Sequence, residues 1–89
     1  MMADIVKEIP FVNSKEYIRA WAEALMKELE LEYKWVSEDK IEFKRFGGEG
    51  FAEIKGNVIL MEIDLAWWAM DFKDEISDKI DARVAKEQL

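Results

Sequence analysis

The side chains that could do chemistry in this chain are carboxylates, because the sequence contains no histidine and no cysteine. That absence excludes disulfides, thiol catalysis, a Cys/His zinc site and a histidine general base. Glu62 and Asp64 stand two positions apart, a spacing that places both side chains on one face of a strand. Paired carboxylates can act as general acid and base, and converging carboxylates can bind calcium.

The surrounding sequence favours neither kind of carboxylate chemistry. It has no EF-hand spacing, and nothing in it supplies a nucleophile or an oxyanion hole. The other acidic residues of the C-terminal third lie along a predicted helix: Asp71, Asp74, Glu75, Asp78 and Asp81. We therefore expect a solvated acidic face, with no metal site, no cofactor and no enzymatic activity.

Length and charge narrow the remaining function classes. A chain of 89 residues, half of them apolar, predicts one domain over residues 1–89. A net charge of −7 argues against nucleic acid as a partner, and an anionic membrane would repel the protein. No apolar run approaches the length of a membrane span or a signal peptide, so we expect no bilayer insertion and a soluble, cytoplasmic protein.

The elements that would position any site follow from periodicity and turn residues. Strands are predicted over residues 4–9, 33–36, 41–46, 51–55 and 58–63. A helix is predicted over residues 14–30, with Asn13 as N-cap and Glu16 completing a capping box. A second helix, capped by Asp64, is predicted over residues 65–86. The expected fold is α+β, in the order β-α-β-β-β-β-α, with two helices packed on one face of an antiparallel sheet.

Turn residues and charges predict the register of the sheet. Gly56-Asn57 predicts a two-residue hairpin that pairs Lys55 with Val58. The glycine-rich segment 47–50 joins two strands and is expected to be a hairpin loop, not a phosphate cradle. Placing Phe46 opposite Phe51 pairs charges of opposite sign, namely Lys44 with Glu53 and Glu42 with Lys55. The helix-facing residues would then include Phe43, Ile54, Ile59, Met61 and Ile63.

Two apolar surfaces are the candidates for function. The first is the outer face of the sheet, which is predicted to carry Tyr33, Trp35, Phe46, Phe51, Val58 and Leu60. Lysine and glutamate stems could cover it, or it could contact an apolar partner or a second copy in a homodimer.

The second surface lies at the start of the last helix. Trp67 and Met70 fall opposite its predicted buried stripe, and an exposed tryptophan beside a methionine suggests an anchor for a partner. Alternatively, Trp67 packs on a neighbouring loop, or the helix begins later. The predicted stripe comprises Leu65, Trp68, Ala69, Phe72, Ile76 and Ile80.

A series of spaced residues from Leu31 onward resembles a known family. Aromatic residues precede an acidic turn, an apolar-x-Phe strand and a Gly-x-x-Gly turn follow, and a Leu-small-aromatic segment opens an acidic helix. These features are Tyr33, Trp35, residues 37–40, Ile41, Phe43, Gly47, Gly50, residues 65–68, Glu75 and Ile76. They resemble the polyhydroxyalkanoic acid system family, small bacterial proteins described as granule regulatory proteins. Members often carry a histidine before the first helix, where this chain has Ile9-Pro10-Phe11.

The resemblance implies a role in storage-polyester metabolism and no catalytic residues. We expect a non-enzymatic protein that contacts a polyester granule surface or a granule protein. The rival expectation is a homodimeric interaction or scaffold module that uses the outer sheet face. A designed origin would agree with the regular helix caps and the opposite-charge pairs predicted across the strands. Trp67 and Met70 on a polar helix face argue against it. A carrier with a pocket between helices and sheet is disfavoured, because the core residues are large enough to fill that space.

Overall fold

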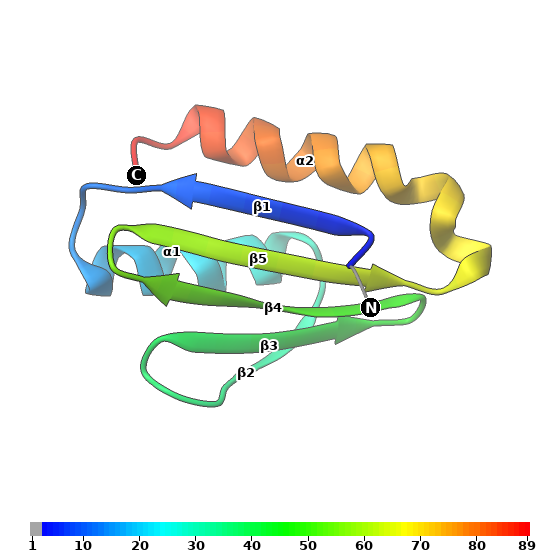
Figure 1. Ribbon diagram of the computed structural model, residues 1–89, viewed down its shortest axis with the longest axis horizontal. Coiled ribbons are helices and arrows are strands. Elements are labelled where there is room, and N and C mark those ends of the chain that lie inside the picture. Colours follow the sequence, from blue (N-terminus) through cyan, green and yellow to red (C-terminus); the bar gives the residue numbers. More distant parts are fainter. Residues whose placement is uncertain (1–2) are drawn as a thin grey trace.

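The computed structural model describes residues 3–89 and confirms the α+β element order (Figure 1). The sheet is antiparallel throughout, with strand order β1-β5-β4-β3-β2. The elements are β1 (Ile5–Pro10), α1 (Lys15–Glu28), β2 (Glu32–Trp35), β3 (Lys40–Arg45), β4 (Gly48–Lys55), β5 (Val58–Leu65), the 3₁₀ helix η1 (Trp67–Phe72) and α2 (Lys73–Lys86).

Both helices contribute to one hydrophobic core on one face of the sheet. In Figure 1, α1 crosses behind the sheet and α2 runs alongside β1. The five helix-facing residues predicted from the sequence are all buried. From the helices, Ile18 and Leu25 of α1 and Ile80 of α2 are fully buried in the same cluster. Apolar burial of this kind is the main favourable term in folding.

The β4–β5 register agrees with the prediction, whereas the β3–β4 register differs. Lys55 lies opposite Val58 across the Gly56-Asn57 turn. In the other hairpin Phe46 and Gly47 form the turn themselves, because Gly47 adopts a φ of 97° that side chains rarely permit. Lys44 therefore lies opposite Glu49, not Glu53. The pairing moves by an even number of residues, so the same side chains still face the helices.

The remaining partners in this hairpin change in the same way. Glu42 lies opposite Phe51 on β4, whereas Lys55 lies beyond the end of the β3–β4 pairing. On the other side of β3, Glu42 lies opposite Lys34 of β2. The predicted alternation of opposite charges on the outer face is thus retained, but with different cross-strand partners.

Both predicted helix caps are wrong. Ser14 is the N-cap of α1, and its Oγ accepts a hydrogen bond from the Tyr17 amide at 3.2 Å. Asp64 is still part of β5, and Ala66 precedes η1 without a side-chain cap. The sheet extends to Leu65, which pairs with Gly48 of β4, and the Leu65 amide donates to the Asp4 carboxylate at 2.8 Å. Regular α-helix then begins only at Lys73.

The molecule has a closed end, which we define by the segments 11–13, 56–57 and 87–89. The amide of Phe11 donates to the carbonyl of Asn57 at 2.9 Å. The amides of Val12 and Asn13 both donate to the Leu89 carbonyl at 2.8 Å. The Asn13 side chain donates to the carbonyls of Gln88 and Leu89. Asn13 is thus not a helix cap but the residue that joins the β1–α1 connection to residues 88 and 89.

Candidate functional site

Two of the predicted outer-face residues lie on the helix side of the sheet. Tyr33 is opposite Phe43 and Trp35 is opposite Ile41, and both of those β3 residues are buried. Trp35 Nε1 donates to the Glu23 carboxylate at 2.8 Å, so the indole packs against α1. The prediction for both aromatics is wrong. A strand of four residues, with no tight turn to fix its register with β3, is too short for its alternation to show which side chains face the helices.

The outer face of the sheet retains Phe51, Val58 and Leu60, each of them half-buried. The Lys40 ammonium lies 4.4 Å from the centre of the Phe51 ring, which is cation–π geometry. Leu60 lies between Glu53 and Glu8 in the cross-strand register. Charged side chains therefore flank the apolar residues of this face.

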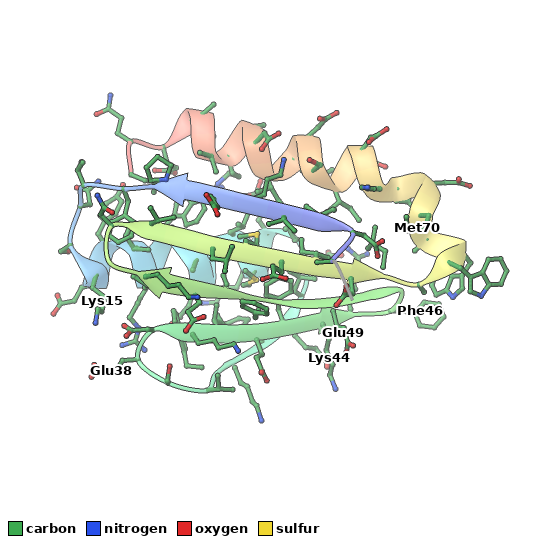
Figure 2. All side chains as sticks on the ribbon, viewed as in Figure 1. Lys15, Glu38, Lys44, Phe46, Glu49 and Met70 are labelled. Atoms are coloured by element: carbon green, nitrogen blue, oxygen red, sulfur yellow. The ribbon has the colours of Figure 1, made fainter. Side chains whose placement is uncertain are left out.

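Of the five aromatic side chains that are exposed within residues 3–89, four belong to the β3–β4 turn and η1, at the end of the molecule opposite the closed end (Figure 2). The fifth, Tyr17, belongs to α1. Phe46 is 93% exposed and Trp67 is 86% exposed, which confirms the predicted exposure of Trp67. The Phe46 and Trp68 rings contact each other in a tilted arrangement, with their centroids 4.8 Å apart and their planes inclined by 41°. We define this aromatic end by five residues: Phe46, Trp67, Trp68, Met70 and Phe72.

Trp68 and Phe72 were predicted to be buried, but they are 43% and 53% exposed. The difference follows from η1, because a 3₁₀ helix advances three residues per turn and does not keep the stripe of an α-helix. Ala69 is the only residue of η1 that is buried. Further along the predicted stripe, Ile80 is buried and Ile76 is partly buried against the core.

A glycine turn holds the aromatic end in place. The Gly47 carbonyl accepts a hydrogen bond from the Ala66 amide at 2.9 Å, which ties the β3–β4 turn to the start of η1. A Cβ atom at Gly47 would lie 2.8 Å from the Trp68 ring, so only glycine lets the indole pack on this turn. The exposed Phe46–Trp68 pair is therefore positioned by backbone contacts.

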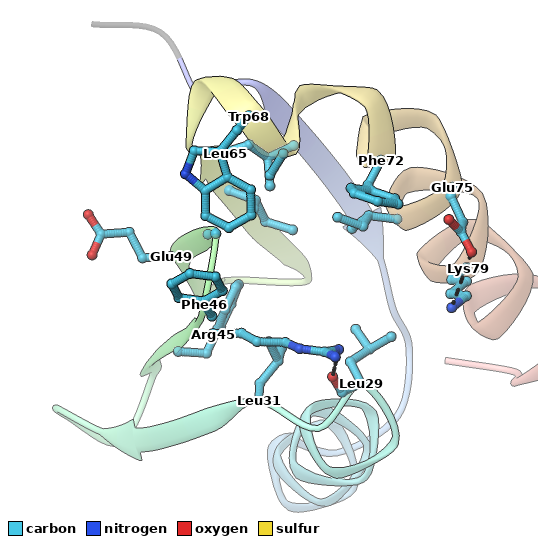
Figure 3. Close-up of a pocket in the computed structure, with 16 residues that line it drawn as sticks. Leu29, Leu31, Arg45, Phe46, Glu49, Leu65, Trp68, Phe72, Glu75 and Lys79 are labelled. Atoms are coloured by element: carbon cyan, nitrogen blue, oxygen red, sulfur yellow. Dashed lines mark hydrogen bonds and ion pairs between the residues drawn. The ribbon is translucent and has the colours of Figure 1, made fainter.

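Beside the aromatic end, a cavity of about 320 Å³ opens between the helices and the sheet (Figure 3). It exists because α1 ends at Glu28, so the first turns of α2 have only the 29–31 connection opposite them. The expectation that large core residues fill this space is wrong here. Its lining includes Leu29, Leu31, Phe43, Ile63, Leu65 and Ile76, with Phe46, Trp68 and Phe72 at the aromatic side and Arg45, Glu49, Glu75 and Lys79 as charged groups.

The carboxylates form no comparable site. Among residues 3–89, no group of three or more acidic side chains is placed to hold a metal ion. Asp64 is exposed and lies opposite Glu49. Lys15 Nζ lies 2.8 Å from Asp39 Oδ1, and this hydrogen bond raises the pKa of Lys15. Figure 2 places Lys15 far from Phe46 and Met70, so this ion pair does not belong to the aromatic end.

Within residues 3–89, no helix is long and apolar enough to span a membrane. Comparison with curated proteins gave no match, and comparison with solved structures gave none either. A family model described as "Putative polyhydroxyalkanoic acid system protein (PHA_gran_rgn)" matches residues 10–87. This match includes the first helix as well as the region from Leu31 onward that carries the resemblance. With nearly all of its length matched, the chain belongs to the polyhydroxyalkanoic acid system family.

Proposed function

We propose that this protein is a non-catalytic, cytoplasmic component of the polyhydroxyalkanoate system and that its aromatic end contacts the apolar surface of a polyester granule. The observation that carries the proposal is the exposure of Trp67, beside Met70 and the tilted Phe46–Trp68 pair. A cluster of large exposed apolar side chains is typical of interaction sites. A granule protein with an apolar patch would be recognised by the same side chains.

The distribution of charge supports binding by one end only. The chain carries a net charge of −7, whereas Asp71 is the one charged residue of η1. A particle coated through the aromatic end would present the acidic remainder to water. Like charges on coated particles repel, which keeps them dispersed.

The proposal is tested by co-sedimentation with polyhydroxybutyrate nanoparticles. The wild type is expected to be retained, and the double variant Trp67→Ala/Met70→Ala to be lost from the pellet. The matched control is Val12→Ala/Val36→Ala, which removes exposed apolar side chains outside the aromatic end. Absence of wild-type retention, or equal loss in both variants, would contradict the proposal.

A homodimer through the outer sheet face is the second candidate. Val6 of β1 is exposed on this face, near the half-buried Leu60 and Phe51. Sedimentation equilibrium of the wild type and Leu60→Lys separates the two candidates. A dimer that Leu60→Lys dissociates, without any change in particle retention, would assign the outer face to self-association.

A further inference from the structure

The cavity beside the aromatic end combines an apolar floor with a charged rim. Leu31, Phe43 and Ile63 contribute to the floor from the α1–β2 connection and the sheet, and Ile76 contributes from α2. Figure 3 shows Arg45 extending toward Leu29 on one side and the Glu75–Lys79 pair on the other. Trp67 and Met70 are absent from the lining, so the cavity and the outward-facing part of the aromatic end are separate surfaces.

The volume limits the size of a ligand. Ligand pockets generally span about 300–1,000 Å³, and this one, at about 320 Å³, is near the lower limit. With about 30 Å³ for each group the size of a water molecule, it has room for about ten methylene-sized groups. This is enough for one medium-length aliphatic chain and too little for a folded peptide.

The rim indicates which polar group such a chain would carry. Arg45 Nη1 donates to the Leu29 carbonyl at 3.0 Å, which holds the guanidinium beside the cavity, and Arg45 Nη2 lies 3.8 Å from Glu30 Oε2 at the exposed side. A bound carboxylate would replace this long, solvent-exposed ion pair. A guanidinium has five N–H donors and binds a carboxylate through paired hydrogen bonds. Lys79 lies on the opposite wall, 3.7 Å from Glu75. The same lining contains two acidic residues, Glu49 and Glu75, so its charges balance and a ligand carboxylate gains attraction only where it contacts Arg45 directly.

The mouth of the cavity is held in position before any ligand binds. The Trp68 ring packs on Gly47, and the Leu65 side chain lies 3.1 Å from the position that a Cβ of Gly48 would take. Binding to walls that are already ordered avoids the entropy cost of ordering them.

We propose that this cavity binds one linear aliphatic monocarboxylate of about ten carbons, with its tail on the apolar floor and its carboxylate on Arg45. This site goes beyond the proposed function, because granule contact through Trp67 and Met70 does not require it. The two can therefore fail independently: the nanoparticle experiment tests the outward surface, and ligand titration tests the cavity.

The experiment is a titration of the ¹⁵N-labelled protein with sodium decanoate below its micelle concentration, followed by amide chemical shifts. Saturable shifts are expected at Gly47, Ala69 and Ile76, and none at Val12. Arg45→Gln is expected to weaken binding about tenfold or more, since a charged hydrogen-bond partner is lost. The control Lys44→Gln removes a cation from the neighbouring position, which does not line the cavity.

Decanol provides a second test that does not depend on any variant being folded. On the wild type it is expected to bind about tenfold more weakly than decanoate, because it lacks the carboxylate. Equal binding of the two ligands would overturn the assignment to Arg45. No saturable shift with decanoate, or shifts confined to Trp67 and Met70, would overturn the cavity as a binding site.

Discussion

The closed end and the aromatic end are both held by backbone hydrogen bonds, but they differ in whether the apolar side chains there are buried or exposed. At the closed end, Asn13 and two backbone amides satisfy the carbonyls of the last two residues, and the Leu89 side chain is buried. At the aromatic end, a backbone hydrogen bond from Ala66 to Gly47 positions large rings that remain exposed. Similar backbone contacts therefore stabilise the fold at one end and present an apolar surface at the other.

This contrast shows how an apolar cluster that is exposed for binding differs from apolar residues that stabilise the fold. An isolated exposed residue such as Val12, which is 96% exposed, is ordinary in a small domain. Several aromatics held beside a cavity are not, because exposing them forgoes the stabilisation that burial would provide. The aromatic end is accordingly the place to expect binding, and the core between the helices and the sheet is the place to expect stability.

The largest expected effect comes from removing a buried side chain near the start of α1. Ile18 is fully buried, and Ile18→Ala should lower the free energy of unfolding by about 2–5 kcal/mol through lost burial and a residual cavity. Phe72→Ala, at the half-exposed aromatic end, should cost less than about 1 kcal/mol. Urea denaturation of both variants checks this, and equal losses would remove the distinction between the two regions.

A smaller effect is expected from the turn that holds the aromatic end. Gly47→Ala places a side chain at positive φ and against the Trp68 ring, and should destabilise the protein by about 1–3 kcal/mol. It should also change the near-ultraviolet circular dichroism of the Phe46–Trp68 pair. The control is Gly56→Ala, which has positive φ but no neighbouring atom within 4 Å of the added Cβ. Identical spectra for both variants would show that Gly47 does not position the rings.

The smallest expected effect comes from the hydrogen bonds of the closed end. Asn13→Ala should cost about 1 kcal/mol, because two donated hydrogen bonds to Gln88 and Leu89 are lost. Faster amide exchange at Val12 should accompany it. Asn13→Asp keeps the size but removes both donors, so its loss should be at least as large. A fully stable Asn13→Asp protein would show that the side chain does not hold this end together.

Local pattern was sufficient to predict much of this molecule. The 3.6-residue period of α1, the alternation in β3 to β5 and the Gly56-Asn57 turn depend on neighbouring residues, and the structure agrees with all three. The exposure of Trp67 was also predicted, because its position opposed the apolar stripe. The spacing of aromatics and glycines likewise indicated the family, and the family model supports that assignment.

Other features depended on contacts between segments that are distant in the sequence. The face on which Tyr33 and Trp35 lie was decided by the pairing of β2 with β3. The 3₁₀ geometry of η1 accompanies its attachment to the β3–β4 turn through Gly47. The cavity arises because α1 ends before it can cover the first turns of α2. The elements and most of the core are thus predictable from the amino-acid sequence, since short-range periodicity specifies them. The cavity and the aromatic end are not, because both are formed by segments that meet only after folding.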